Sequence, residues 1–384
     1  MPEILFVTWD GGGNVPPATA LARELVGRGH RVRFLGHASQ EAALTGAGFE
    51  FVRPAHTRPF SSLEANSPLA MMACFGDAGM GRDLLEEVRR HPVDLVVVDC
   101  LMFGALDAAR GAGLRYVVLE HLYDGFYRRG ILGGPMGLNL RLRRLAPRRA
   151  LDSAAARVLT TLPELDPVAA RPGLHQVGPV VEVAPRTPAE PTVLVSLSTF
   201  GFPRMTESLQ QVVDAASGLD ARVVVTTGPA IDPAALTVPS GVEVHRFVPH
   251  VELFPRTTLF VGHGGHGSTM QALAHDVPMA LMPMDRLTDQ PAVARSVAAS
   301  RAGRVLKKGA RAATIAPVLA ELLADGAHRD AAAGLGAAIR ALPGARLGAD
   351  AVESVLGQTS AESPGARSPR GSTTTSSRPS HPAS

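Results

Sequence analysis

The residues best suited to chemistry lie in a glycine-rich stretch near residue 260. Residues 259–261 are apolar enough for a buried parallel strand, and residues 270–273 continue as a helix. Glycines between a strand and a helix let the backbone approach an anion closely, and the helix dipole favours negative charge there. This pattern predicts a phosphate or diphosphate site. Its predicted contacts are His263, Gly264, Gly265, Gly267, Ser268 and Thr269.

An acid and an amide follow the next predicted strand, residues 279–282. Asp289 and Gln290 combine hydrogen-bond acceptors with donors, which suits the vicinal hydroxyls of a sugar. A diphosphate site with such a pair beside it indicates a nucleotide-sugar site.

The run HGGHGST from residue 263, the DVP at residues 276–278 and the DQ at residues 289–290 resemble the donor signature of family-1 glycosyltransferases. The resemblance implies the GT-B fold, an α/β fold of two facing Rossmann-like doubly wound parallel-sheet domains. It also implies inverting transfer of a hexose or deoxyhexose from a dTDP- or UDP-sugar to a small hydrophobic acceptor. Such enzymes serve the biosynthesis of antibiotics and other natural products.

The same resemblance gives roles to residues elsewhere in the second half. Thr199 would contact the diphosphate, although Ser198 replaces the usual glycine before it. Phe247 would stack on the nucleotide base, the backbone of Val248 would hydrogen-bond to that base, and His263 would donate to a diphosphate oxygen. The chain has no Asp-x-Asp motif, so protein dipoles rather than a metal are expected to offset the diphosphate charge. No cofactor is predicted besides the nucleotide-sugar co-substrate.

The general base is the main departure from the family pattern. Many relatives have Gly-His-x-x-Pro after the first strand, whereas this chain has Asn14 at the histidine position, and an amide does not accept a proton at neutral pH. We predict that Asp10 or Asp99 serves instead, because each lies at a strand end facing the cleft. His121 is a further candidate. Alternatively the acceptor is acidic enough to need little help, and Asn14 only contacts it.

Two other functions remain open from the sequence. A nucleotide-sugar epimerase on a similar scaffold would turn over the donor without an acceptor. A non-catalytic nucleotide-sugar-binding partner would account for the missing histidine.

Composition narrows the class of protein. The 384 residues are 45% hydrophobic with a formal charge of +3, and only 4% are aromatic. Scattered arginines without aromatic platforms argue against a nucleic-acid partner. Two cysteines without metal-ligand spacing, no signal peptide and no apolar run of membrane length favour a cytoplasmic protein with no stable membrane insertion, either monomer or homodimer.

Alternation of apolar runs and helical patterns predicts two α/β domains. The expected strands are residues 4–8, 31–35, 93–99, 116–120, 193–197, 222–226, 242–247, 259–261 and 279–282. We expect an acceptor domain at 1–180, a linker at 181–191, a nucleotide-sugar domain at 192–345, a crossover helix at 346–357 and a disordered tail at 358–384.

Two long segments between strands, residues 54–80 and 121–147, are expected to build the acceptor pocket. The side chains in them that line the pocket or pack in the core are Met71, Met72, Phe75, Phe126, Tyr127 and Met136.

Overall fold

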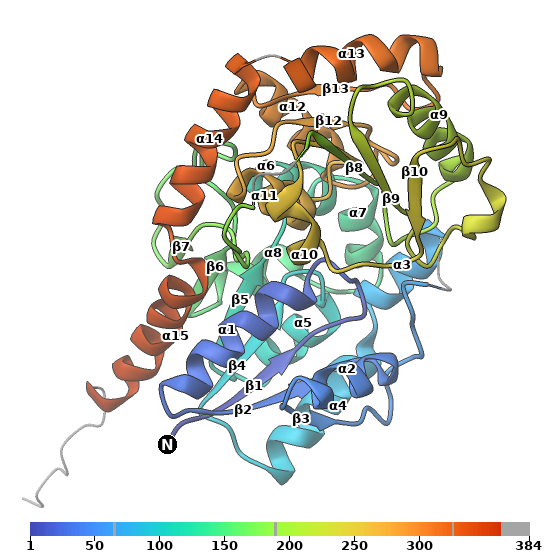
Figure 1. Ribbon diagram of the computed structural model, residues 1–384. Coiled ribbons are helices and arrows are strands. Elements are labelled where there is room, and N and C mark those ends of the chain that lie inside the picture. Colours follow the sequence, from blue (N-terminus) through green and yellow to red (C-terminus); the bar gives the residue numbers. More distant parts are fainter. Residues whose placement is uncertain (64–66, 188–189, 325, 362–384) are drawn as a thin grey trace, which may run out of the picture.

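The computed structural model describes residues 1–63, 67–187, 190–324 and 326–361 (Figure 1). Its strands form two sheets in which all neighbouring strands run parallel. The first sheet has the order β3-β2-β1-β4-β5-β6-β7, and the second has the order β10-β9-β8-β11-β12-β13. The predicted pair of doubly wound parallel sheets is therefore confirmed.

All nine predicted strands are present, with ends within about two residues of those expected. The first sheet contains β1 (Glu3–Val7), β2 (Arg31–Leu35), β3 (Glu50–Val52), β4 (Leu95–Asp99), β5 (Tyr116–Glu120), β6 (Ala156–Leu159) and β7 (Leu174–Gln176). The second contains β8 (Thr192–Ser196), β9 (Arg222–Thr226), β10 (Val242–His245), β11 (Leu259–Gly262), β12 (Met279–Leu281) and β13 (Gly303–Val305). Strands β3, β6, β7 and β13, each of three or four residues, were not predicted.

Helices separate the strands. Those before the second sheet are α1 (Val15–Gly27), α2 (Glu41–Gly46), α3 (Pro68–Phe75), α4 (Ala78–Arg90), α5 (Phe103–Gly111), α6 (Asp124–Phe126), α7 (Pro135–Leu142) and α8 (Pro147–Asp152), with a π-helical turn at Tyr127–Leu132. Those that follow are α9 (Met205–Ala216), α10 (His250–Leu253), α11 (His266–Ala274), α12 (Gln290–Ala299), α13 (Ala312–Ala324), α14 (Gly326–Ala341) and α15 (Gly344–Ala361).

The central strands of each sheet are buried on both faces, which explains why they are mostly apolar rather than alternating. In β1, Leu5 and Val7 join one core cluster while Ile4 and Phe6 join the cluster on the opposite face. In β11, Leu259 and Val261 likewise join one core cluster, while Phe260 joins the cluster on the opposite face. Because both sides are covered, side chains can reach a ligand only at the strand ends.

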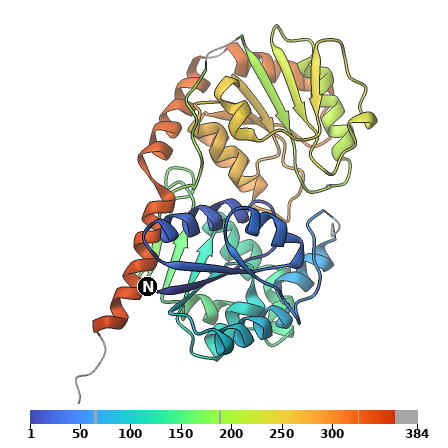
Figure 2. The ribbon, with the colours of Figure 1, turned by 60° about the horizontal axis from the view of Figure 1, so that its bottom comes forward.

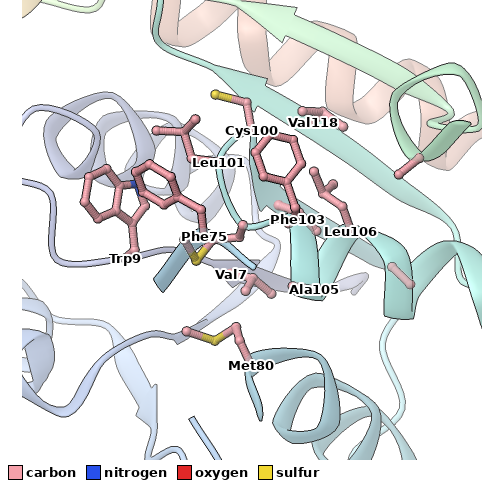
Figure 3. Packing of buried hydrophobic residues seen from close by; sticks show 14 of the residues in the cluster. Val7, Trp9, Phe75, Met80, Cys100, Leu101, Phe103, Ala105, Leu106 and Val118 are labelled. Carbon is pink, nitrogen blue, oxygen red and sulfur yellow. The ribbon is translucent and has the colours of Figure 1, made fainter. Parts of the chain in front are cut away.

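For two of the residues expected either to line the acceptor pocket or to pack in the core, the structure shows core packing. Phe75 packs edge-on against Trp9, with ring centroids 4.9 Å apart, within the cluster shown in Figure 3. Tyr127 is fully buried and its hydroxyl donates to the Cys100 carbonyl oxygen. Phe75, at the end of α3, and Tyr127, at the start of the π-helical turn, are therefore core residues. Met71, Met72, Phe126 and Met136 stay half-buried.

Helices α4 and α5 pack closely through glycines. A Cβ on Gly81 would lie 2.7 Å from the Gly104 carbonyl oxygen, and one on Gly104 would lie 2.6 Å from the Asp77 carbonyl carbon. We expect Gly104→Ala to lower the free energy of unfolding by about 1–3 kcal/mol, measured by urea denaturation, because backbone atoms cannot move aside. Gly111→Ala in the same helix, where a Cβ meets nothing within 4 Å, should be neutral or slightly stabilising. Equal effects of the two changes would contradict close helix packing.

The described part of the chain ends in a helix on the first domain. Helix α14 packs against α11, and α15 packs against α1 and β6 (Figure 2). α15 begins beside Gly178, where a Cβ on Gly344 would lie 2.6 Å from the carbonyl oxygen. This helix runs through Ala361, so residues 358–361 of the predicted tail are helical. The rest of that tail, 362–384, lies outside the described residues. In the described part of the chain, no helix has the length and apolarity needed to span a bilayer.

Candidate active site

The predicted site residues cluster at the carboxyl ends of strands. In open parallel sheets, ligands bind at these ends where the strand order reverses. That reversal lies between β1 and β4 in the first sheet and between β8 and β11 in the second. Asp10 and Asn14 follow β1, Asp99 ends β4, and Thr199 follows β8.

Side chains from the two domains meet in front of these strand ends. The Tyr123 and Ser296 hydroxyl oxygens lie 3.0 Å apart, and the Tyr123 ring lies edge-on to His266 at 5.8 Å between centroids. A Cβ on Gly12 would lie 3.6 Å from Thr199 Oγ1. The two groups of predicted residues therefore face each other between the domains.

The glycine-rich turn between β11 and α11 forms a cradle of backbone groups. Gly264 has a φ of 82°, in the left-handed region that favours glycine. Gly265 caps α11, and the His263 ring fills the space beside it, so that a Cβ would lie 2.7 Å from Cε1. The Thr269 N–H donates to the Gly265 carbonyl oxygen at 3.1 Å. The N–H groups preceding it, including those of Gly267 and Ser268, have no intrahelical acceptor and are suited to an anion.

Two polar atoms beside the cradle are buried and have no hydrogen-bond partner among the described residues. They are Nδ1 of the half-buried His263 and Oγ1 of the buried Thr269. Burial, together with the nearby His250 ring, lowers the pKa of His263 to about 4. The ring is therefore neutral at pH 7 and would act on a diphosphate as a dipole rather than as a cation. Ser268 Oγ donates to the Gly265 carbonyl oxygen at 3.3 Å.

His266, to which the sequence attached no role, is the first residue of α11 and lies at the domain contact. Burial and the neighbouring His121 lower its pKa to about 3. Its Nε2 is buried and has no partner within the part of the chain that is described. Tyr123, three residues beyond the end of β5, was also missed. His266 and Tyr123 each follow the end of a strand, and this position in the sequence was the signal that could have identified them.

Asp289 and Gln290 are both buried at the start of α12. Gln290 Oε1 accepts the N–H groups of Met284 at 2.8 Å and Asp285 at 3.2 Å, so this carbonyl holds the preceding loop. Burial raises the pKa of Asp289 to about 6, although His121 and the Tyr123 N–H act in the opposite direction. Asp289 Oδ2 lacks a partner among the described residues. Of the two residues, Asp289 is therefore the better placed to accept a hydrogen bond from a sugar hydroxyl.

The remaining residues predicted to bind the nucleotide-sugar are exposed or half-buried. Phe247 is 71% exposed, which leaves its ring free to stack on a base. Val248 is half-buried, and Thr199 is exposed next to the turn after β1. His250 Nε2 lies 3.1 Å from Ser196 Oγ and thereby ties this segment to the end of β8. These residues lie at the ends of β8 and β10.

Three of the four residues predicted to be catalytic, Asn14, Asp99 and His121, come together. Asn14 is buried, and its Nδ2 lies 3.0 Å from Thr8 Oγ1, 3.0 Å from the Trp9 carbonyl oxygen and 3.1 Å from Asp99 Oδ2. His121 Nε2 lies 3.1 Å from the same Asp99 oxygen, at an oblique angle. Asp99 Oδ1 accepts the Leu101 N–H at 2.9 Å.

Asp10 is separate from this group. It is half-buried, and its Oδ2 accepts a hydrogen bond from Ser39 Oγ at 2.8 Å. The role of Asp10 or Asp99 as base stays a prediction.

Comparison with known proteins supports the same class. A family profile described as "Erythromycin biosynthesis protein CIII-like, C-terminal domain" matches residues 210–350, and a "Glycosyl transferase 4-like domain" profile matches residues 12–177. The chain is 28% identical to 4'-demethylrebeccamycin synthase of Lentzea aerocolonigenes over 80% of this chain and 88% of that protein. It is 31% identical to zeaxanthin glucosyltransferase of Pseudescherichia vulneris over 55% and 53% of the respective chains.

Solved structures show the same architecture. The glycotransferase of kitacinnamycin superimposes with a TM-score of 0.77 at 25% identity, covering 92% of this chain and 99% of the other. The calicheamicin glycosyltransferase CalG4 gives a TM-score of 0.74 at 24% identity over 93% and 99%. Nothing in these similarities supports the epimerase alternative. With facing parallel sheets, a glycine-rich helix cap and these relatives, the chain is a GT-B, family-1-like glycosyltransferase of the natural-product type.

Proposed function

We propose that this enzyme transfers a hexose or deoxyhexose, with inversion, from a dTDP- or UDP-sugar to a small hydrophobic natural-product acceptor. The cradle at the start of α11 carries the proposal. It offers unpaired N–H groups, and beside them lie the neutral His263 ring and the Thr269 hydroxyl, whose buried Nδ1 and Oγ1 atoms have no partners among the described residues. A diphosphate would satisfy these groups together.

The cradle also suits the chemistry of transfer. When the bond between the anomeric carbon and the diphosphate breaks, negative charge grows on the leaving oxygen. Preorganised N–H groups at a helix N-terminus stabilise such charge. The structural neighbours VinC and SpnG have been crystallised with dTDP and thymidine diphosphate respectively, which supports a nucleotide diphosphate as the leaving group here.

The acceptor side supports a hydrophobic partner. Leu69 on α3 and Leu138 and Leu142 on α7 are exposed within the two segments predicted to build the acceptor pocket. SpnG has also been solved with the spinosyn aglycone. Exposed apolar side chains at these loops would cover an acceptor as it binds.

Binding and transfer can be tested in sequence. We expect dTDP or UDP at 100 times its Kd to stabilise the protein by about 2.7 kcal/mol in thermal unfolding, whereas ADP should do much less. Incubation of dTDP-glucose or UDP-glucose with quercetin, a macrolide aglycone or an indole, with EDTA present, should then add one hexose by mass spectrometry. If neither nucleotide stabilises the protein and no product forms, the proposal fails.

A further inference from the structure

One carboxylate oxygen at the end of β4 serves two side chains. Asp99 Oδ2 lies 3.1 Å from Asn14 Nδ2 and 3.1 Å from His121 Nε2. Asn14, which follows β1, has no basic nitrogen. His121 approaches the same oxygen from the neighbouring strand, because β4 and β5 run side by side and end together.

His121 also faces the donor side of the site. Besides Asp99, the charged or titratable groups around it are Glu120 on β5, Asp289 at the start of α12, His266 at the start of α11, and Cys100 after β4. Glu120 is paired with Arg157. The Cys100 thiol remains neutral because burial raises its pKa. His121 is thus close to both the first residue of the cradle helix and the acid predicted to bind sugar.

The surroundings favour a histidine that accepts and keeps a proton. Burial by itself lowers the pKa of His121, but Asp99, with help from Asp289 and Glu120, raises it above the ordinary histidine value. With Nε2 turned towards Asp99, Nδ1 is the nitrogen left to accept a proton. A carboxylate that holds one ring nitrogen while the other takes a proton is a recurrent arrangement in catalysis.

We propose that His121, positioned by Asp99, is the general base of this enzyme. The inference rests on the proposed sugar transfer. Asn14 holds the other side of Asp99 Oδ2 and keeps the carboxylate in place for His121.

The step balances without any further reactant. The acceptor O–H or N–H gives its proton to His121 Nδ1 while its heteroatom forms a bond to the anomeric carbon. The bond from that carbon to the diphosphate oxygen breaks, and the electron pair leaves with the nucleoside diphosphate. Asp99 stabilises the imidazolium until the proton passes to solvent.

Rate measurements distinguish the candidates. His121→Gln is expected to lower kcat by about 10²–10⁴-fold with little change in the KM for the donor, and to remove the acid limb of the pH–rate profile. Asp99→Asn should move that limb to lower pH, because loss of the carboxylate charge lowers the pKa of His121. Exposed His175→Gln is the matched control and should behave as the unaltered enzyme. The assay uses the donor and acceptor that give most product in the transfer panel.

Histidine NMR tests the charge relation without turnover. The C–H resonance of His121, assigned by its absence in His121→Gln, should titrate above the ordinary histidine value, and Asp99→Asn should lower its midpoint. Full activity of His121→Gln would overturn the role of His121. So would a pH–rate profile that loses its acid limb in Asp99→Asn or Asp10→Asn but keeps that limb in His121→Gln. Retained binding of dTDP or UDP by His121→Gln shows that the fold is intact. Absence of transfer by the unaltered protein would instead overturn the proposed function.

Discussion

Replacing Gly265 by alanine is expected to weaken binding of dTDP or UDP about ten- to hundredfold, because overpacking a buried site costs about 1–3 kcal/mol. The added methyl would overlap the His263 ring, whose Cε1 would be 2.7 Å away. That ring is half-buried, and moving it aside would take it from its place beside the cradle. The Gly265 backbone, at φ −65° and ψ 135°, suits any residue, so the effect isolates the steric conflict.

Isothermal titration calorimetry with each nucleotide measures this change. Gly334→Ala in α14 is the matched control, because it adds the same methyl to an exposed helix where nothing lies within 4 Å. The control should bind with unaltered affinity. If Gly265→Ala also binds both nucleotides with full affinity, the donor diphosphate does not lie against this turn.

Arg157→Met is expected to lower the free energy of unfolding by about 3–5 kcal/mol, the typical cost of leaving a buried charge without its partner. Arg157 Nη2 donates to Glu120 Oε2 at 2.8 Å, and Arg157 Nε donates to Oε1. The Glu120 side chain is only 1% exposed. Burial raises the pKa of Glu120 even with Arg157 beside it, so without Arg157 the loss should be smaller in acid, where a protonated Glu120 is neutral.

Urea unfolding at pH 7 measures this loss, and the second sheet offers a matched control. Arg222 Nε and Nη2 donate to the two carboxylate oxygens of Glu243 at 2.7 Å and 2.9 Å, also between adjacent parallel strands. These side chains are 37% and 42% exposed, so Arg222→Met should cost only about 0–1 kcal/mol. Similar losses for the two variants would mean that burial does not govern the cost.

Local pattern was enough to predict nine of the strands and the glycine-rich turn. Residues 116–120 form β5 with the predicted ends, because an apolar run of that length has few other structures open to it. The turn at residues 263–265 was predicted for a similar reason, since glycines between a strand and a helix allow backbone conformations that other residues rarely adopt. These features depend on residues that are neighbours in the chain.

Partnerships between distant residues were decided only by the tertiary structure. Asn14 and Asp99 are 85 residues apart, and only the strand order that sets β1 beside β4 brings them together. The sequence suggested Gln290 for a sugar, yet its carbonyl holds the backbone of its own loop. The identity of a side chain states which bonds it can form, whereas strand order and packing determine which partner is near enough to form them.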